Sequence, residues 1–223
     1  MKITKMTNRT TMFTVPENEN YDVNMAVIFG TKHNFIIDTG TGEDCAEAML
    51  EHVGNDLKPI VVINTHGDWD HVAGNSSFDQ HTVISHKLGR DRMDQEWDNQ
   101  IKKYRSNSEF FKGKVSKTLP NMVFEGELYF PEDGIRLVHT PGHKGCDITI
   151  YDEVDKILYT GDNFGIVEGK AVYWGEDITD FEKIIATYKT FDFELCISGH
   201  SEPQGFEVIK FLEATLVELK ENS

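Results

Sequence analysis

The chain has 223 residues, of which 39% are hydrophobic and 11% aromatic, as in an ordinary globular protein. Its 22 basic and 38 acidic residues give a net charge of −16. Such a charge disfavours binding to nucleic acids, anionic membranes and other polyanions. We therefore expect a small-molecule substrate, and an anionic one would need a local positive centre such as a metal ion.

The sequence pattern predicts neither a signal peptide nor a membrane-spanning segment. The first residues, "MKITKMTNRTTMFTVPENE", contain no apolar core of signal-peptide length, and nowhere do about 18 apolar residues run together. The three cysteines, Cys45, Cys146 and Cys196, are odd in number and widely spaced, which argues against a disulfide framework. We expect a cytoplasmic protein, with Cys146 as a small buried side chain. The sequence does not indicate an oligomeric state.

Short apolar segments predict a series of strands along the chain. They lie at residues 23–30, 34–40, 59–65, 81–85, 127–130, 135–140, 147–152, 156–161 and 195–198. Several are continuous apolar runs, as expected for strands that are covered on both faces by other layers.

Helices are predicted between some of these strands. Residues 41–55 and 179–191 each begin with a capping-box pattern, formed by Thr41 with Asp44 and by Thr179 with Glu182. Residues 202–220 carry an apolar stripe of Phe206, Ile209, Leu212, Leu216 and Leu219. Residues 87–119 lack strand alternation and predict one or two surface helices in an insertion. Interleaved strands and helices without a boundary predict a single α/β domain over residues 1–223.

Polar clusters follow directly where apolar strands stop. The strand at 59–65 leads into "HGDWDH", which holds His66, Asp68, Asp70 and His71. Later strands lead into "TPGH", "TGD" and "SGH", whose last residues are His143, Asp162 and His200. The carboxyl ends of strands converge on one edge in layered α/β folds, so these side chains should meet there. Seven such groups exceed the four ligands of one tetrahedral zinc and suit two metals with an open position for water.

These motifs, in this order, resemble the ligand motifs of the metallo-β-lactamase-fold superfamily, and "IIDTG" resembles its early strand motif. The resemblance implies a four-layer αββα sandwich, with Asp38 as a buried carboxylate behind the ligands. It also implies how the ligands are divided: one metal would take His66, Asp68 and His143, the other Asp70, His71 and His200, and Asp162 would bridge them.

Asp68 departs from the commonest pattern of the family, which has histidine there, and is similar in this respect to the flavodiiron branch. Two divalent metals carry +4 and the three aspartates −3, so the centre would have a net charge of +1 instead of +2. A more anionic ligand set favours iron or manganese more than the all-nitrogen face that a third histidine would give, but zinc fits either. The metal could therefore be zinc, iron or manganese.

The first hypothesis for the function is a metal-dependent hydrolase. A hydroxide bridging the two metals would cleave an ester, thioester, lactone or similar bond, with Asp70 orienting it and passing on a proton. One alternative is a diiron redox or oxygen-handling protein. It would need an external electron donor, because no flavodoxin-like segment is present. Another alternative is a weakly catalytic ligand-binding module. His86, Tyr173 and Trp174 are candidates for the substrate pocket, although such aromatic side chains are more often part of the core.

Overall fold

A computed structural model describes residues 1–16, 22–104 and 109–222. In this part of the chain, seven strands form a first sheet in sequence order: β1 (Lys2–Lys5), β2 (Thr10–Pro16), β3 (Asp22–Phe29), β4 (Asn34–Ile37), β5 (Ile60–Ile63), β6 (Thr82–His86) and β7 (Met122–Phe124). Strands β4 to β7 run parallel to one another, and the others pair antiparallel.

The second sheet has the order β15 (Gln204–Gly205), β14 (Leu195–Ser198), β11 (Ile157–Gly161), β10 (Ile148–Asp152), β9 (Ile135–His139) and β8 (Glu127–Phe130). Only β11 and β14 are parallel to each other in this sheet, as far as the structure describes it. A separate hairpin joins β12 (Phe164–Val167) to β13 (Lys170–Tyr173).

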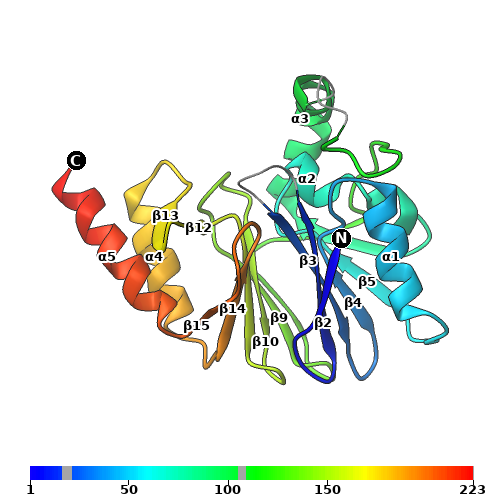
Figure 1. Cartoon of the computed structure of the whole chain (residues 1–223), viewed down its shortest axis with the longest axis horizontal. Helices are drawn as coiled ribbons and strands as arrows, with labels where there is room; N and C mark the ends of the chain where they lie inside the picture. Colours follow the sequence, from blue (N-terminus) through cyan, green and yellow to red (C-terminus); the bar gives the residue numbers. More distant parts are fainter. Residues whose placement is uncertain (17–21, 105–108, 223) are drawn as a thin grey trace.

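The two sheets pack face to face, and helices cover their outer faces (Figure 1). The central core joins β4–β6 residues such as Phe35 and Ile63 to β9–β14 residues such as Leu137 and Ile197. Helix α1 (Glu43–Val53) packs on the outside of the first sheet. Helices α4 (Ile178–Tyr188) and α5 (Val208–Glu221) pack on the outside of the second. The predicted four-layer αββα sandwich is therefore confirmed.

All nine predicted strands are present, with ends within a few residues of the expected ones. The sequence reasoning missed β1, β2, β7, β12, β13 and β15. Most of these are short, β1 and β7 are largely exposed, and β2 is buried but interrupts its apolar residues with threonines (TTMFTVP). Their apolar pattern is therefore weak.

The predicted helix starts need correction. Helix α1 begins after Gly42 and has no side-chain cap, so Thr41 and Asp44 do not form a capping box. In α4 the cap lies two residues earlier than predicted, because the Asp177 carboxylate accepts a hydrogen bond from the Thr179 backbone N–H at 2.8 Å. Helix α5 begins only at Val208, so Phe206 precedes it and is 49% exposed.

Helix α3 (Lys87–Tyr104) follows β6 and lies near the short helix α2 (Trp69–Val72), as Figure 1 shows. Residues 105–108 of the predicted segment 87–119 lie outside the described residues, and residues 109–119 contain no helix. Helix α3 is not merely a surface helix, because Met93, Trp97 and Ile101 pack against Trp69 of α2. A Cβ atom at Gly67 would lie only 2.8 Å from the Gly89 carbonyl oxygen, so α3 also packs closely on the "HGDWDH" loop.

No helix in the described part of the chain is long and apolar enough to cross a membrane.

Candidate metal centre

The seven predicted ligands come together at one edge of the sandwich. His66 follows β5, and Asp70 and His71 lie in α2 directly after it. His143, Asp162 and His200 follow β9, β11 and β14 of the second sheet. Because both sheets deliver side chains from the carboxyl ends of these strands, the cluster lies between the two halves of the fold.

The distances divide these side chains into overlapping groups. His66, Asp68 and His143 form one possible metal-binding group, and Asp70, His71 and His200 form another. The Asp162 carboxylate lies between them: its Oδ2 is 3.1 Å from His200 Nε2 and 3.5 Å from His66 Nε2, and its Oδ1 is 3.3 Å from His71 Nε2. His66, His71 and Asp162 form a third group by the same distances. The division of these side chains between two metals therefore stays a prediction.

All four histidines point the same ring atom into the centre. His143 Nδ1 lies 3.0 Å from the Trp174 carbonyl oxygen, and His200 Nδ1 lies 2.7 Å from the Asp22 carbonyl oxygen. A carbonyl only accepts, so each Nδ1 carries the proton and donates it. The neutral rings therefore keep an Nε2 lone pair directed at the cluster, as metal binding requires.

Asp38 fixes the other two rings. It accepts hydrogen bonds from the Thr65 hydroxyl and from His71 Nδ1, at 2.7 and 2.8 Å. Since the Thr65 hydroxyl gives its only proton to Asp38, its oxygen accepts from His66 Nδ1 at 3.0 Å. Asp38 has a φ of 57°, a strained conformation for a non-glycine residue that these contacts hold in place.

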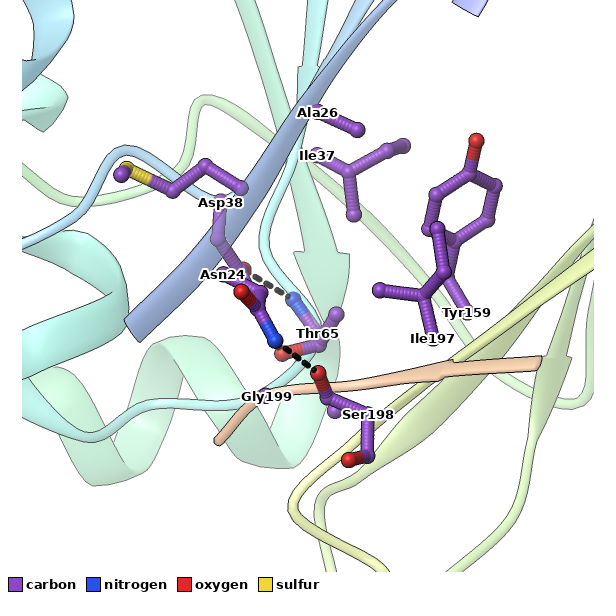
Figure 2. A pocket seen from close by; sticks show the side chains of 11 residues that line it. Asn24, Ala26, Ile37, Asp38, Thr65, Tyr159, Ile197, Ser198 and Gly199 are labelled. Atoms are coloured by element: carbon purple, nitrogen blue, oxygen red, sulfur yellow. Dashed lines mark hydrogen bonds between the residues drawn. The ribbon is translucent and has the colours of Figure 1, made fainter. Parts of the chain in front are cut away.

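Figure 2 shows the layer behind the cluster, where Asp38 also accepts from the Thr65 backbone N–H at 2.7 Å. Across from it in the same view, the Asn24 side-chain amide donates to the Ser198 carbonyl oxygen at 3.0 Å. It also donates to the Ser201 carbonyl oxygen at 2.8 Å. These bonds hold both sides of the loop that carries His200. The cavity between them is only about 10 Å³, the size of a single water molecule.

The electrostatics of the cluster favour positive charge. Burial opposes charging of His71 and His200, but the neighbouring carboxylates outweigh it. Asp162 and Asp70 raise the pKa of His200 to about 9, and with Asp38 they raise that of His71 as well. Conversely, His200, His71 and His66 hold the pKa of Asp162 well below its usual range despite its burial. A site that stabilises protons in this way also attracts a metal cation.

Two buried atoms test whether a metal fits. Among the described residues, His66 Nε2 and Asp162 Oδ1 are buried without a hydrogen-bond partner, although buried polar atoms are nearly always paired. Both atoms point into the cluster. Imidazole nitrogens and carboxylate oxygens are donors that zinc, iron and manganese accept, so a metal ion fits the residues present.

Asp68 is held by helix α3. Its Oδ2 lies 3.5 Å from His143 Nε2 and 4.0 Å from His66 Nε2, while its Oδ1 accepts from Arg92 Nε at 3.0 Å. The Gln100 amide lies 3.5 Å from the same Oδ1. Burial alone would raise the pKa of Asp68, but the hydrogen bond with His143 and the charges of His66 and Arg92 hold it well below its usual range.

A cavity of about 290 Å³ opens above the cluster. Asp68, Asp70, His143 and Asp162 form its floor, and its walls comprise Trp69, Arg92, Gln100, Lys103, Tyr104 and Lys144. Sequence reasoning missed the wall residues, most of which belong to α3. Their positions in the sequence carry no local signal, because only tertiary packing brings α3 to the site.

The three predicted pocket residues have different surroundings. Trp174 lies beside the centre, with its ring centroid 5.6 Å from that of His200. Tyr173 instead stacks on Phe181, and its hydroxyl donates to the Asp177 carbonyl oxygen at 3.0 Å, so it is part of the packing around α4. His86 stacks on His139 at 3.7 Å between ring centroids and does not line the 290 Å³ cavity. Cys146 is buried, as predicted.

Comparisons with known proteins agree with this geometry. The family model of the metallo-beta-lactamase superfamily matches residues 19–200. Solved structures with the same fold include TMB-1 (18% identity, TM-score 0.77, 98% of both chains covered). Metallo-beta-lactamases from Pontibacter korlensis (18%, 0.71, 98% of both chains) and Hirschia baltica (16%, 0.74, 96% of this chain and 97% of that one) are also similar. No curated protein matches the chain.

Proposed function

The chain belongs to the metallo-beta-lactamase superfamily, and on that premise we propose that it is a hydrolase that holds two divalent metal ions. Its substrate would be a small molecule with an ester, thioester, lactone or similar bond. The observation that carries the proposal is the convergence of four Nε2 atoms and three carboxylates on one edge, with every Nδ1 already bonded to an oxygen.

The residues would share the metals in two of the three overlapping groups. His66, Asp68 and His143 would hold one ion and Asp70, His71 and His200 the other, with Asp162 between them. When bound, the ions would supply Lewis acidity, which lowers the pKa of water and polarises a carbonyl oxygen. Zinc, iron and manganese all suit this donor set.

Asp70 has the position for proton transfer. Its Oδ2 lies 3.4 Å from His200 Nε2, and its carboxylate also lines the cavity where a substrate would lie. It can therefore orient the attacking water, hold a proton at its carboxylate and pass that proton to the leaving group. Trp69 and Tyr104 would limit the access of bulk water from the side of α3.

Metal analysis combined with turnover tests this proposal. Protein purified without added metal should contain two divalent ions per chain and should hydrolyse members of an ester, thioester and lactone panel. A chelator should abolish turnover, and restoring the metal should recover it. Two bound ions without turnover on any substrate would instead support a ligand-binding module.

The carboxylate at position 68 favours a second candidate function, that of a diiron redox or oxygen-handling protein. A carboxylate beside His66 and His143 makes the ligand set harder and more anionic, which suits iron. This function would need an external electron donor. Bound iron with an oxo-bridge absorption band, reduction by a flavoprotein and no ester turnover would support it over the hydrolase. We expect either protein to act in the cytoplasm, where its three buried thiols remain reduced.

A further inference from the structure

Three cationic side chains line the 290 Å³ cavity above the metal centre. Arg92 and Lys103 come from α3, and Lys144 directly follows His143. The chain as a whole has a net charge of −16, with only 22 basic residues. Three of these basic residues surround one small cavity, whereas the chain as a whole is strongly acidic.

These cations are available to a ligand. Arg92 uses its Nε for Asp68, and among the described residues its terminal nitrogens donate no hydrogen bond. The Lys103 ammonium lies 4.9 Å from the centroid of the Tyr104 ring and, in the described part of the chain, has no carboxylate partner. The Lys144 ammonium forms an ion pair with Asp68 Oδ2 at 3.9 Å, which is too long for a hydrogen bond, so its N–H groups can still donate to a ligand.

The charges do not help to bind metal. The three carboxylates of the floor, Asp68, Asp70 and Asp162, carry −3, and the three wall cations balance this charge before any metal enters. When two divalent ions bind, the net charge of the cavity rises from zero to +4. The wall cations thus oppose metal binding, and an anionic ligand in the cavity would offset part of that cost.

We propose that these residues bind an anionic group of the substrate, a carboxylate or a phosphate, at a distance from the scissile bond. This inference rests on the proposed hydrolase function and specifies its substrate class. The Arg92 guanidinium presents a planar pair of donors that suits either anion, and Lys103 and Lys144 add point charges. Trp69 and Tyr104 would contact the apolar body between the two ends. The volume limits the substrate to a small molecule.

The test uses pairs of ligands that differ only in the distal charge. Calorimetry with the zinc-loaded protein compares glutarate with monomethyl glutarate, since both keep one carboxylate for the metals. Phosphonobutyrate serves as the phosphate-like arm, and succinate and adipate vary the length. In parallel, the kcat/KM of the para-nitrophenyl ester of glutaric acid is compared with that of its methylated, neutral form.

We expect the wild type to prefer the charged member of each pair by about 10-fold or more. Lys103→Gln and Lys144→Gln should each reduce this preference several-fold. Lys102→Gln is the matched control, because this neighbouring lysine of α3 is exposed and does not line the cavity. It should keep the wild-type preference. Whether glutarate or phosphonobutyrate binds more tightly identifies the anion.

Equal affinity of the wild type for the charged and neutral members would overturn the inference, and so would an equal loss of preference in Lys102→Gln. Failure of the hydrolase proposal gives a different result: neither ester turns over, while the binding preference persists. Ester turnover without charge preference would leave the hydrolase intact and refute only the anionic substrate.

Discussion

The Nε atom of Arg92 lies 3.0 Å from Oδ1 of Asp68, and this contact ties helix α3 to the unusual aspartate of the "HGDWDH" motif. Arg92 thus supplies the counter-charge for a carboxylate where the commonest family pattern has histidine. The other oxygen of Asp68 remains directed at His66 and His143.

Replacing Asp68 by histidine should shift the centre toward zinc. The substitution adds a nitrogen donor and removes one negative charge, so the zinc-to-iron ratio of the purified protein should rise. Arg92, which is 30% exposed, would lose its partner, so the free energy of unfolding should fall by about 1 kcal/mol or less. Arg92→Gln in the same protein should recover part of that loss. Unchanged metal content in both Asp68→His and Asp68→Ala would show that Asp68 is not a ligand.

His143→Ala and His200→Ala should each abolish turnover and lower metal content while the fold remains cooperative. The reason is that each imidazole supplies one ligand, whereas the packed layers that position it involve many other residues. Elemental analysis, turnover and urea unfolding check the three parts. Global unfolding of both variants would mean that the metals are chiefly structural.

Asp38→Asn should weaken metal binding by about 10- to 100-fold, although Asp38 would touch no metal. An amide has a single accepting oxygen and cannot replace both carboxylate oxygens, one of which accepts from the Thr65 N–H and the other from the Thr65 hydroxyl and His71 Nδ1. Its NH2 group would face one of these donors, which disturbs the hydrogen bonds that orient the His71 ring. Competition with a chromogenic chelator measures the affinity. An affinity equal to that of the wild type would show that the ring orientations do not depend on Asp38.

Gly199→Ala should damage the centre for steric reasons alone. A Cβ atom there would overlap Oδ1 of Asp162 and lie 2.8 Å from Cε1 of His71. We expect reduced metal content and at least a 10-fold loss of turnover. Gly89→Ala in α3 is the control, because its Cβ would have no neighbour closer than 3.7 Å. If both variants behave alike, the close approach at Gly199 is not important.

Asp133→Asn should destabilise the protein by about 2 kcal/mol near neutral pH. Its buried carboxylate accepts from the Lys32 and His33 backbone N–H groups, at 2.6 and 3.3 Å, and pairs with the His33 ring at 2.8 Å. Burial opposes ionisation, but these contacts hold the pKa of Asp133 below its usual value. A lowered pKa in the folded state means that the stabilisation is complete above about pH 4 and is lost as the pH falls further.

Urea unfolding of the wild type and Asp133→Asn at a series of pH values measures this difference. The gap between the two proteins should be present above about pH 5 and should shrink below about pH 4. Asp79→Asn, an exposed carboxylate, should show no gap at any pH. A gap that grows as the pH falls below about 4 would contradict the assigned direction of the Asp133 pKa.

Much of this centre could be predicted from the sequence because strand and ligand are contiguous in the chain. His66, Asp162 and His200 come within three residues of the ends of β5, β11 and β14, and those strands are recognisable by their continuous apolar runs. Where the carboxyl ends of strands meet at one edge, the order of the motifs is enough to place their side chains together.

Tertiary structure alone decided which side chains surround that centre. Arg92 reaches Asp68 from 24 residues away and Asp38 reaches His71 from 33 residues away, and neither separation corresponds to a helical or strand period. Tyr173 was a candidate pocket residue but stacks on Phe181, because the hairpin that carries it packs into the core shared with α4 and α5. Local patterns indicate which residues are buried and where a strand ends, whereas contacts between layers depend on how whole elements pack. The clustering of the candidate ligands could therefore be predicted from the sequence, and the walls of the pocket could not.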